Sequence, residues 1–136
     1  MTHSQKRAPK AAAANGLRPH LTLPQLRRAV LGMEDLRERT VVKLLYYCAL
    51  RASEVGLLQV GAFDPRQRTL SVTRVKGSLG YTYPLEPWVL DDLRVWRAAA
   101  PAGLFLFGHA GDPTRPLDRF AVFRFWRRAA QRARLP

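Results

Sequence analysis

The stretch VVKLLYYCALRASEVGLL, from Val41 to Leu58, decides how the rest of the chain is interpreted. It predicts a buried apolar helix, a tight turn that carries Arg51, and the start of a second helix that contains Glu54. Arg51 is unusual because it follows a run of large apolar side chains, and an unpaired buried charge is very costly. Glu54 is the expected partner of the guanidinium, whose other N–H groups could then hold a phosphate. The stretch leaves two interpretations open: a structural Arg–Glu pair or an anion-binding arginine.

The composition indicates a basic protein of one domain. The chain has 136 residues, and 23 Lys and Arg against 10 Asp and Glu give a formal net charge of +13. Such a charge indicates a polyanionic partner, most commonly nucleic acid. No apolar stretch could cross a bilayer and no signal-peptide pattern is present, so we expect a cytoplasmic protein without membrane contact. The single cysteine, Cys48, lies in the apolar run and the three histidines are scattered, so we expect no metal and no cofactor.

The first third of the chain predicts a tail and two helices. Residues 1–20 are Ala-rich and basic with few large apolar side chains, and we expect them to be disordered. Thr22–Gln25 reads as a capping box that begins a helix ending at Leu31. The next helix is expected to begin at Met33 or Glu34. Its early charged side chains are expected to be mostly solvated: Glu34, Arg37, Glu38 and Arg39.

The remaining residues predict a small sheet followed by two helices. Short runs of β-branched and aromatic residues between turn residues indicate three strands. Apolar residues at helical spacing then indicate the helices. The expected strands are Val60–Phe63, Thr69–Val75 and Tyr81–Leu85, and the later elements are a helix over Pro87–Arg97, a buried extended segment Leu104–Phe107, a loop Gly108–Pro116 and a helix from Leu117 to Arg134.

The last predicted helix is both apolar and rich in arginine. Its inner side is expected to consist of Leu117, Phe120, Phe123, Trp126 and Ala130. A solvated basic face is one interpretation of the rest, but contact with phosphates is the better one for so many cations. The arginines are Arg115, Arg119, Arg124, Arg127, Arg128, Arg132 and Arg134.

Two motifs resemble the catalytic domain of the tyrosine recombinases, the family of phage integrases and Xer-type recombinases. Ala49–Leu58 match the first box of that family, G/A-L-R-x-S-E-x-x-x-L. Lys76-Gly77 and Pro84-Leu85 match the setting of its β-hairpin lysine. The resemblance covers residues 21–136 and implies an α+β domain, mainly α, with a small three-stranded antiparallel sheet.

The resemblance also implies roles for single residues. Arg51, supported by Glu54, would neutralise charge on the reacting phosphate. Lys76 would act as the general acid that protonates the leaving 5′-oxygen, from a hairpin that reaches the minor groove. DNA contacts are implied for Arg74, Arg115, Arg119, Arg124, Arg127 and Arg128.

Other parts of the family's catalytic site do not occur in these 136 residues. The second box, His-x-x-Arg, and the nucleophilic tyrosine follow, in the family, after the segment that here ends at residue 136. The tyrosines that are present are expected in the core or in the hairpin: Tyr46, Tyr47, Tyr81 and Tyr83. We therefore expect a truncated recombinase-like protein, the N-terminal half of the catalytic domain, that binds duplex DNA and does not cleave it alone.

Whether the chain is an enzyme stays open. Three other functions are also possible interpretations of the sequence. The chain could be a subunit of a split recombinase, with another chain or a second copy completing the site. It could also be a docking or inhibitory partner of an intact recombinase, because uncovered apolar side chains usually find a partner. An RNA- or ribosome-associated role is the third alternative.

Overall fold

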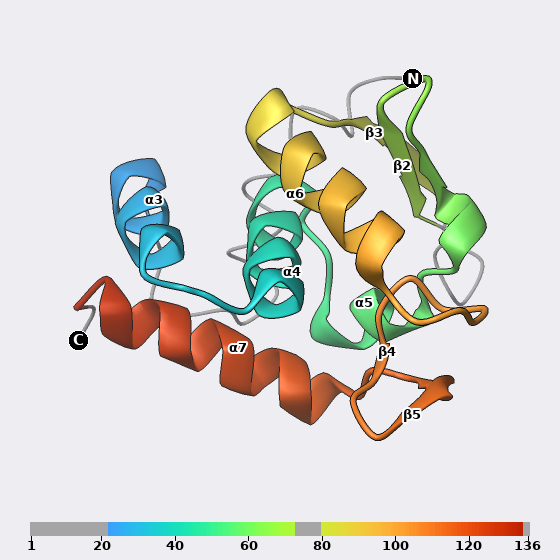
Figure 1. The fold of residues 1–136 in the computed structure, drawn as a ribbon. Helices are drawn as coiled ribbons and strands as arrows, with labels where there is room; N and C mark the ends of the chain where they lie inside the picture. The colour runs from blue at the N-terminus through green and yellow to red at the C-terminus, as the bar shows by residue number, and fades with distance from the viewer. Residues whose placement is uncertain (1–21, 73–79, 135–136) are drawn as a thin grey trace.

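The computed structural model describes residues 22–72 and 80–134, so the predicted tail over residues 1–20 lies outside it. Helices surround a central helix, and a small sheet lies at one side (Figure 1). This arrangement confirms the predicted α+β fold, mainly α, with a three-stranded antiparallel sheet. The described helices are α3 (Leu23–Leu31), α4 (Leu36–Tyr47), α5 (Ala52–Leu57), α6 (Pro87–Ala99) and α7 (Arg119–Arg132), with a 3₁₀ turn at Val60–Ala62.

The beginning of α3 follows the predicted capping box. The Thr22 hydroxyl accepts the Gln25 backbone N–H at 3.3 Å, and the Gln25 side chain accepts the Thr22 N–H at 2.9 Å. The predicted beginning of the next helix at Met33 or Glu34 is wrong. Helix α4 begins at Leu36, because Asp35 is its N-cap and accepts the Glu38 N–H at 2.9 Å.

Helix α4 is the centre of the core. It packs against α6, α7, α3 and α5 (Figure 1). Four of its apolar side chains have no solvent-exposed surface: Val41, Val42, Leu44 and Leu45. Lys43, which lies between them in the sequence, is also buried. The helix is therefore buried around most of its circumference, as expected of a helix enclosed by others.

The three-stranded sheet has the order β1 (Phe63–Asp64), β2 (Thr69–Val72) and β3 (Tyr81–Pro84), all antiparallel. The Asp64 carboxylate accepts the N–H groups of the next turn, as that turn was predicted. The strand predicted from Val60 is wrong over its first three residues. They form a 3₁₀ turn instead, because the Ala62 N–H donates to the Gln59 carbonyl at 2.9 Å. The predicted second turn falls mostly within residues 73–79, outside the described residues.

The segment before α7 forms a hairpin where a loop was predicted. Strands β4 (Gly108–His109) and β5 (Asp112–Pro116) pair antiparallel. Arg37 of α4 donates to the Gly108 carbonyl at 3.0 Å and so fixes the hairpin on the core. The extended segment before it is buried only at its end: Leu104 is exposed, whereas Leu106 and Phe107 are buried.

The predicted inner face of α7 is wrong at Phe120 and Phe123, which are 59% and 40% exposed. Leu117 and Trp126 are buried as predicted. Asp118 caps the helix by accepting the Ala121 N–H at 2.9 Å. The face that packs on the core consists of Ala121, Val122, Phe125, Trp126 and Ala129.

In the described part of the chain, no helix combines the length and the apolar character that crossing a bilayer requires.

Candidate functional site

Arg51 is the N-cap residue of α5, and Glu54 lies in the first turn of that helix. The Glu54 carboxylate accepts the backbone N–H of Arg51 at 2.8 Å, and the Glu54 N–H donates to the Arg51 carbonyl at 2.9 Å. Glu54 is 8% exposed. The glutamate therefore fixes the main chain at Arg51, as in the second half of a capping box.

The predicted pair between the Arg51 guanidinium and Glu54 does not form among the described residues. The physical reason is that the Arg51 side chain is exposed and solvated, while the buried Glu54 carboxylate accepts the Arg51 backbone N–H instead. The chain turns sharply just before it, where Ala49 has a φ of 53°. The arginine thus faces solvent from a fixed backbone position, which leaves its side chain available to an anion.

Lys76 and Arg74 lie within residues 73–79, outside the described residues. The flanking strands are described, and Val72 of β2 pairs with Tyr81 of β3. The roles of Lys76 and Arg74 stay predictions.

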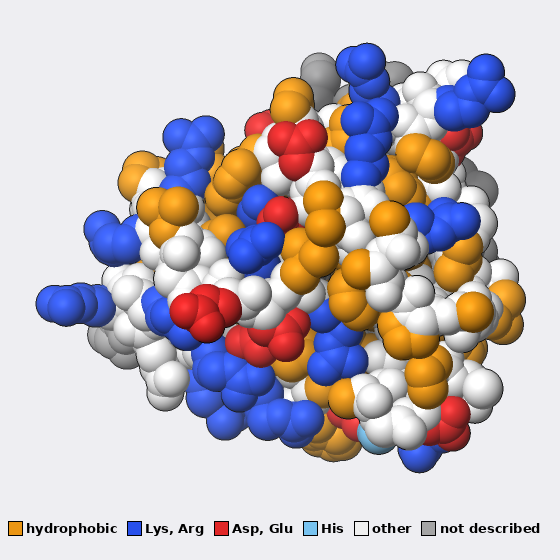
Figure 2. All heavy atoms as spheres, in the orientation of Figure 1, with side chains coloured by type: hydrophobic (Ala, Val, Ile, Leu, Met, Phe, Trp, Pro, Cys, Tyr) orange, Lys and Arg blue, Asp and Glu red, His pale blue; other side chains and the backbone are white. Residues whose placement is uncertain are grey.

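Apart from Arg74, the arginines predicted to contact DNA lie just before α7 or on it, and these are exposed: Arg115, Arg119, Arg124, Arg127 and Arg128. Figure 2 shows Lys and Arg side chains gathered along the lower left edge of the molecule, over α7. No Asp or Glu occurs from Arg119 to Arg134. We call this surface the arginine face; it consists of Arg119, Arg124, Arg127, Arg128, Arg132 and Arg134.

Arg128 differs from the other members of the arginine face, because it already has a partner. Its guanidinium donates two hydrogen bonds to the Glu38 carboxylate, at 2.7 and 3.0 Å. The hydrogen bonds to Glu38 raise the pKa of Arg128 above its ordinary value. Glu38 was predicted to be mostly solvated and is instead half-buried, because this arginine covers it.

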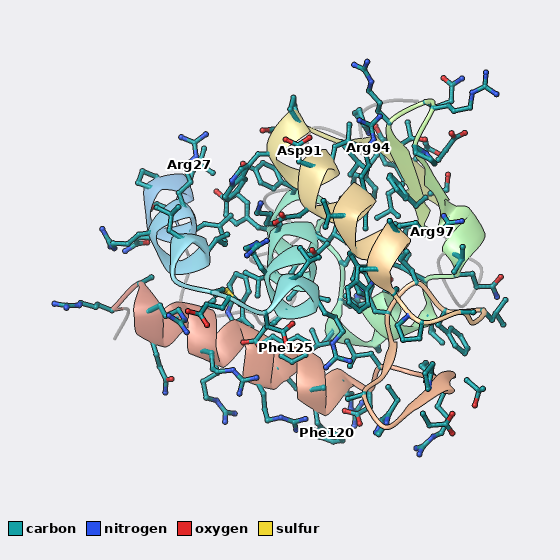
Figure 3. The ribbon with its side chains drawn as sticks, viewed as in Figure 1. Arg27, Asp91, Arg94, Arg97, Phe120 and Phe125 are labelled. Atoms are coloured by element: carbon teal, nitrogen blue, oxygen red, sulfur yellow. The ribbon has the colours of Figure 1, made fainter. Side chains whose placement is uncertain are left out.

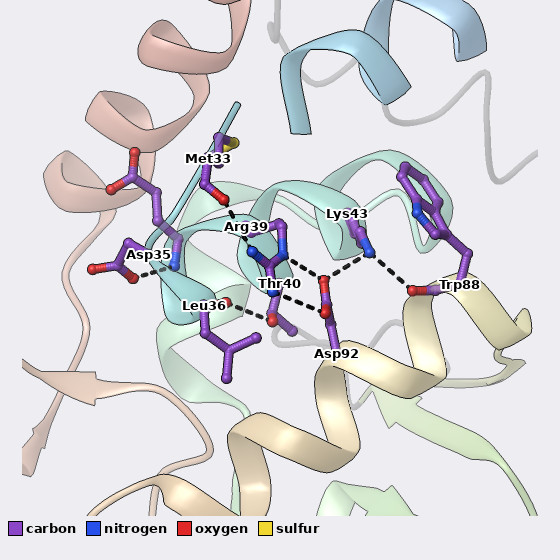
Figure 4. Close-up of polar contacts among 9 residues, drawn as sticks. Met33, Asp35, Leu36, Arg39, Thr40, Lys43, Trp88 and Asp92 are labelled. Carbon is purple, nitrogen blue, oxygen red and sulfur yellow. Dashed lines mark hydrogen bonds and ion pairs between the residues drawn. The ribbon is translucent and has the colours of Figure 1, made fainter. Parts of the chain in front are cut away.

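A second ionic cluster, which the sequence did not predict, joins α4 to α6 (Figure 4). The Asp92 carboxylate accepts from Arg39 at 2.8 and 3.1 Å and lies 2.7 Å from the Lys43 ammonium. Lys43 is only 3% exposed; it also donates to the Trp88 carbonyl at 2.9 Å, and its ammonium lies 4.1 Å from the centre of that indole ring. Arg39 was predicted to be solvated, but it is half-buried because Asp92 holds it.

Burial and pairing oppose each other in this cluster. Burial alone would raise the pKa of Asp92, but the hydrogen bonds from Arg39 and Lys43 outweigh it and hold that pKa below its ordinary value. Burial lowers the pKa of Lys43 by more than Asp92 raises it. The cluster is enclosed between two helices, so its role is to hold α4 on α6. Arg39 and Lys43 lie four residues apart on one helix face and so reach the same carboxylate, but this spacing does not identify Asp92 as their partner.

Comparison with known proteins places these observations in a family. A family model described as "Phage integrase family" matches residues 10–136. A solved structure titled "Crystal structure of XerA recombinase" has a similar fold, with a TM-score of 0.69 and 17% sequence identity. The alignment covers 83% of this chain and 42% of that one, so the chain spans less than half the length of that structure. No curated protein matches the sequence.

Proposed function

The chain belongs to the phage integrase family, whose members act in DNA recombination and integration, and on this basis we propose that its 136 residues bind duplex DNA without cleaving it. Phosphate contacts would supply most of the affinity, so binding would depend little on sequence and steeply on salt.

The observation that carries the proposal is the arginine face. Its cations are exposed along one helix, and no acidic residue of that helix balances them. Like charges on a helix repel one another, so such a face lowers the stability of the folded chain unless a polyanion neutralises it. Arg51 supports the same function, because Glu54 fixes its backbone and its side chain is exposed.

The absence of cleavage is proposed from the chemistry available in these residues. Formation of a phosphotyrosyl bond needs a tyrosine oxygen in line with phosphorus and cations on the non-bridging oxygens. Tyr47 is half-buried, and its hydroxyl is buried. Its ring packs edge-to-face on Trp88, with the ring centroids 5.9 Å apart. The rings of Tyr81 and Tyr83 in β3 pack on each other with their centroids 4.6 Å apart. The packing of these rings supports the proposal that they do not act as nucleophiles.

The test is fluorescence anisotropy with duplex DNA at a series of salt concentrations. Each phosphate contact contributes about −0.9 to the slope of log K against log salt. Substituting both Arg124 and Arg127 by alanine should flatten the slope by about 2. A matched control is Arg97→Ala, since Arg97 is an exposed cation on α6, away from α7 (Figure 3). No binding of wild-type protein at low salt would refute the proposal, and tight binding to structured RNA alone would favour an RNA partner.

A second candidate function is that of a subunit completed by another chain. The observation in its favour is Leu57, which is 53% exposed and lines a cavity of about 430 Å³ between α5, the 3₁₀ turn and β2. An exposed leucine at the edge of a cavity is a typical docking feature. Size-exclusion chromatography with light scattering tests it. A monomer that binds no apolar dye would argue against this candidate.

A further inference from the structure

Phe120 and Phe123 contribute little to the folded core of this chain. They are 59% and 40% exposed, although phenylalanine is usually buried. In Figure 3 Phe120 lies on the outer side of α7, whereas Phe125 lies on the side toward α4. Their exposure therefore needs an explanation outside the fold.

Helix geometry places Phe120 at the centre of the arginine face. Residues advance by about 100° around an α-helix, so Phe120 lies about 180° from the buried Ala129. By the same geometry, Arg119 and Arg128 flank Phe120 on its two sides, at roughly 80–100°. The guanidinium of Arg119 lies 5.1 Å from the centre of the Phe120 ring. The outer side of α7 thus has an apolar centre with cations around it.

This arrangement of charge and apolar surface matches one part of duplex DNA. The major groove is about 12 Å wide and admits a helix; phosphates line its edges and base edges form its floor. Its distinctive apolar group is the C5-methyl of thymine, and phenylalanine is among the side chains that contact it. A second copy of this chain fits less well, because each copy carries a net charge of +13 and the two would repel.

We propose that Phe120 and Phe123 contact thymine methyl groups in the major groove, while a flanking arginine, Arg119, holds a phosphate at its edge. This inference rests on the proposed function, because it requires DNA to lie on α7. It adds a preference for sequence that phosphate contacts alone do not supply.

The experiment compares a short alternating A·T duplex with the same duplex in which deoxyuridine replaces every thymidine. The two have equal charge and equal base pairing and differ only in the methyl groups. Wild-type protein should bind the thymine duplex more tightly, by about fourfold for each methyl group that it buries. Replacing both phenylalanines by alanine (Phe120→Ala, Phe123→Ala) should abolish this difference and leave the salt slope unchanged. Circular dichroism should show the folded state, since neither side chain is buried in the core.

The control is Val95→Ala, because Val95 is 57% exposed on α6 and should not alter the thymine preference. Equal binding of both duplexes by wild-type protein would overturn the inference and leave the proposed function intact. No binding of either duplex would instead refute the proposed function. If the double alanine variant lost self-association and kept its DNA affinity, the two phenylalanines would form a protein interface and the inference would be wrong.

Discussion

Gly56 of α5 lies directly against the main chain of Leu117, so that a Cβ atom at position 56 would be 1.9 Å from the Leu117 carbonyl oxygen. Only glycine allows so close an approach. The contact joins α5, whose N-cap is Arg51, to the residue just before the N-cap of α7, the helix that carries the arginine face. The two candidate DNA-binding elements therefore approach each other closely at this point.

Gly56→Ala should destabilise the fold by about 1–3 kcal/mol or more, because the backbone of α5 or of Leu117 must move. Thermal unfolding followed by circular dichroism measures the effect. Gly61→Ala is the control, since nothing lies within 4 Å of a Cβ at that position. Equal unfolding temperatures for the two variants would show that the contact is not tight in solution.

Acid should weaken the fold through Asp92, whose pKa is held below its ordinary value. As pH falls below the unfolded value of about 3.9, the unfolded chain takes up a proton at Asp92 before the folded chain does. The stabilisation is therefore complete above that pH and is lost as pH falls through the folded pKa. Urea unfolding at a series of pH values should show this loss.

The matched variant replaces all three members of the ionic cluster by apolar residues, Arg39→Met and Lys43→Met with Asp92→Leu. Such replacements are often neutral or stabilising, whereas removal of one partner costs about 3–5 kcal/mol. The triple variant should therefore fold and should lose less stability in acid than wild-type protein. If its acid sensitivity were unchanged, other carboxylates would dominate the pH dependence.

Ala49→Gly should stabilise the fold by about 0.5–1 kcal/mol, because Ala49 has a φ of 53° and glycine adopts that conformation without strain. Chemical denaturation is the measurement. The same change at Ala98, an exposed position within α6, should cost about 0.5–1 kcal/mol. A loss of stability from Ala49→Gly would mean that the methyl group contributes more by packing than the turn costs.

Glu38→Gln should strengthen DNA binding, because it releases Arg128 from its present partner. The slope of log K against log salt should steepen by about 0.9 if Arg128 then contacts a phosphate. Glu34→Gln makes the same change of charge at an exposed position and should leave the slope unaltered. Equal effects of the two variants would indicate a general effect of net charge. The fold should lose less than about 1 kcal/mol, since the pair is partly exposed.

A suicide DNA substrate should form no covalent adduct with this chain. The tyrosines lie in the core or the sheet, and absence of one stabilising group at the phosphorane typically lowers rates by about 10²–10³. Denaturing electrophoresis is the measurement. A protein–DNA band that survives it, and that a Tyr→Phe change at position 46, 47, 81 or 83 abolishes, would contradict the prediction.

Local rules predicted those parts of the fold that neighbouring residues determine. The Thr22 capping box and the turn after Asp64 were predicted because a side chain there satisfies backbone groups two or three residues away. The face of α7 was mistaken because apolar residues occur on both sides of that helix, and only tertiary packing selects between Phe120 and Phe125.

The candidate site and the ionic cluster, like the fold, were predictable only where neighbouring residues determine the contacts. A spacing of three residues allows Glu54 either to pair with the Arg51 guanidinium or to cap the Arg51 backbone N–H. The sequence could not show that Glu54 caps the backbone. The pairing of Lys43 with Asp92 joins helices far apart in sequence, and no local pattern encodes it.

The packing of α7 against α3 has a consequence for how the chain folds during synthesis. Arg28 of α3 donates to the Ala133 carbonyl at 3.3 Å, a contact across more than a hundred residues. The native packing of α3 against α7 therefore cannot form until α7 has been made. At roughly 5–20 residues per second this interval lasts several seconds, during which α3 and α4 expose apolar surface. The nascent chain should thus be most prone to aggregation, and most dependent on chaperones, just before α7 emerges from the ribosome.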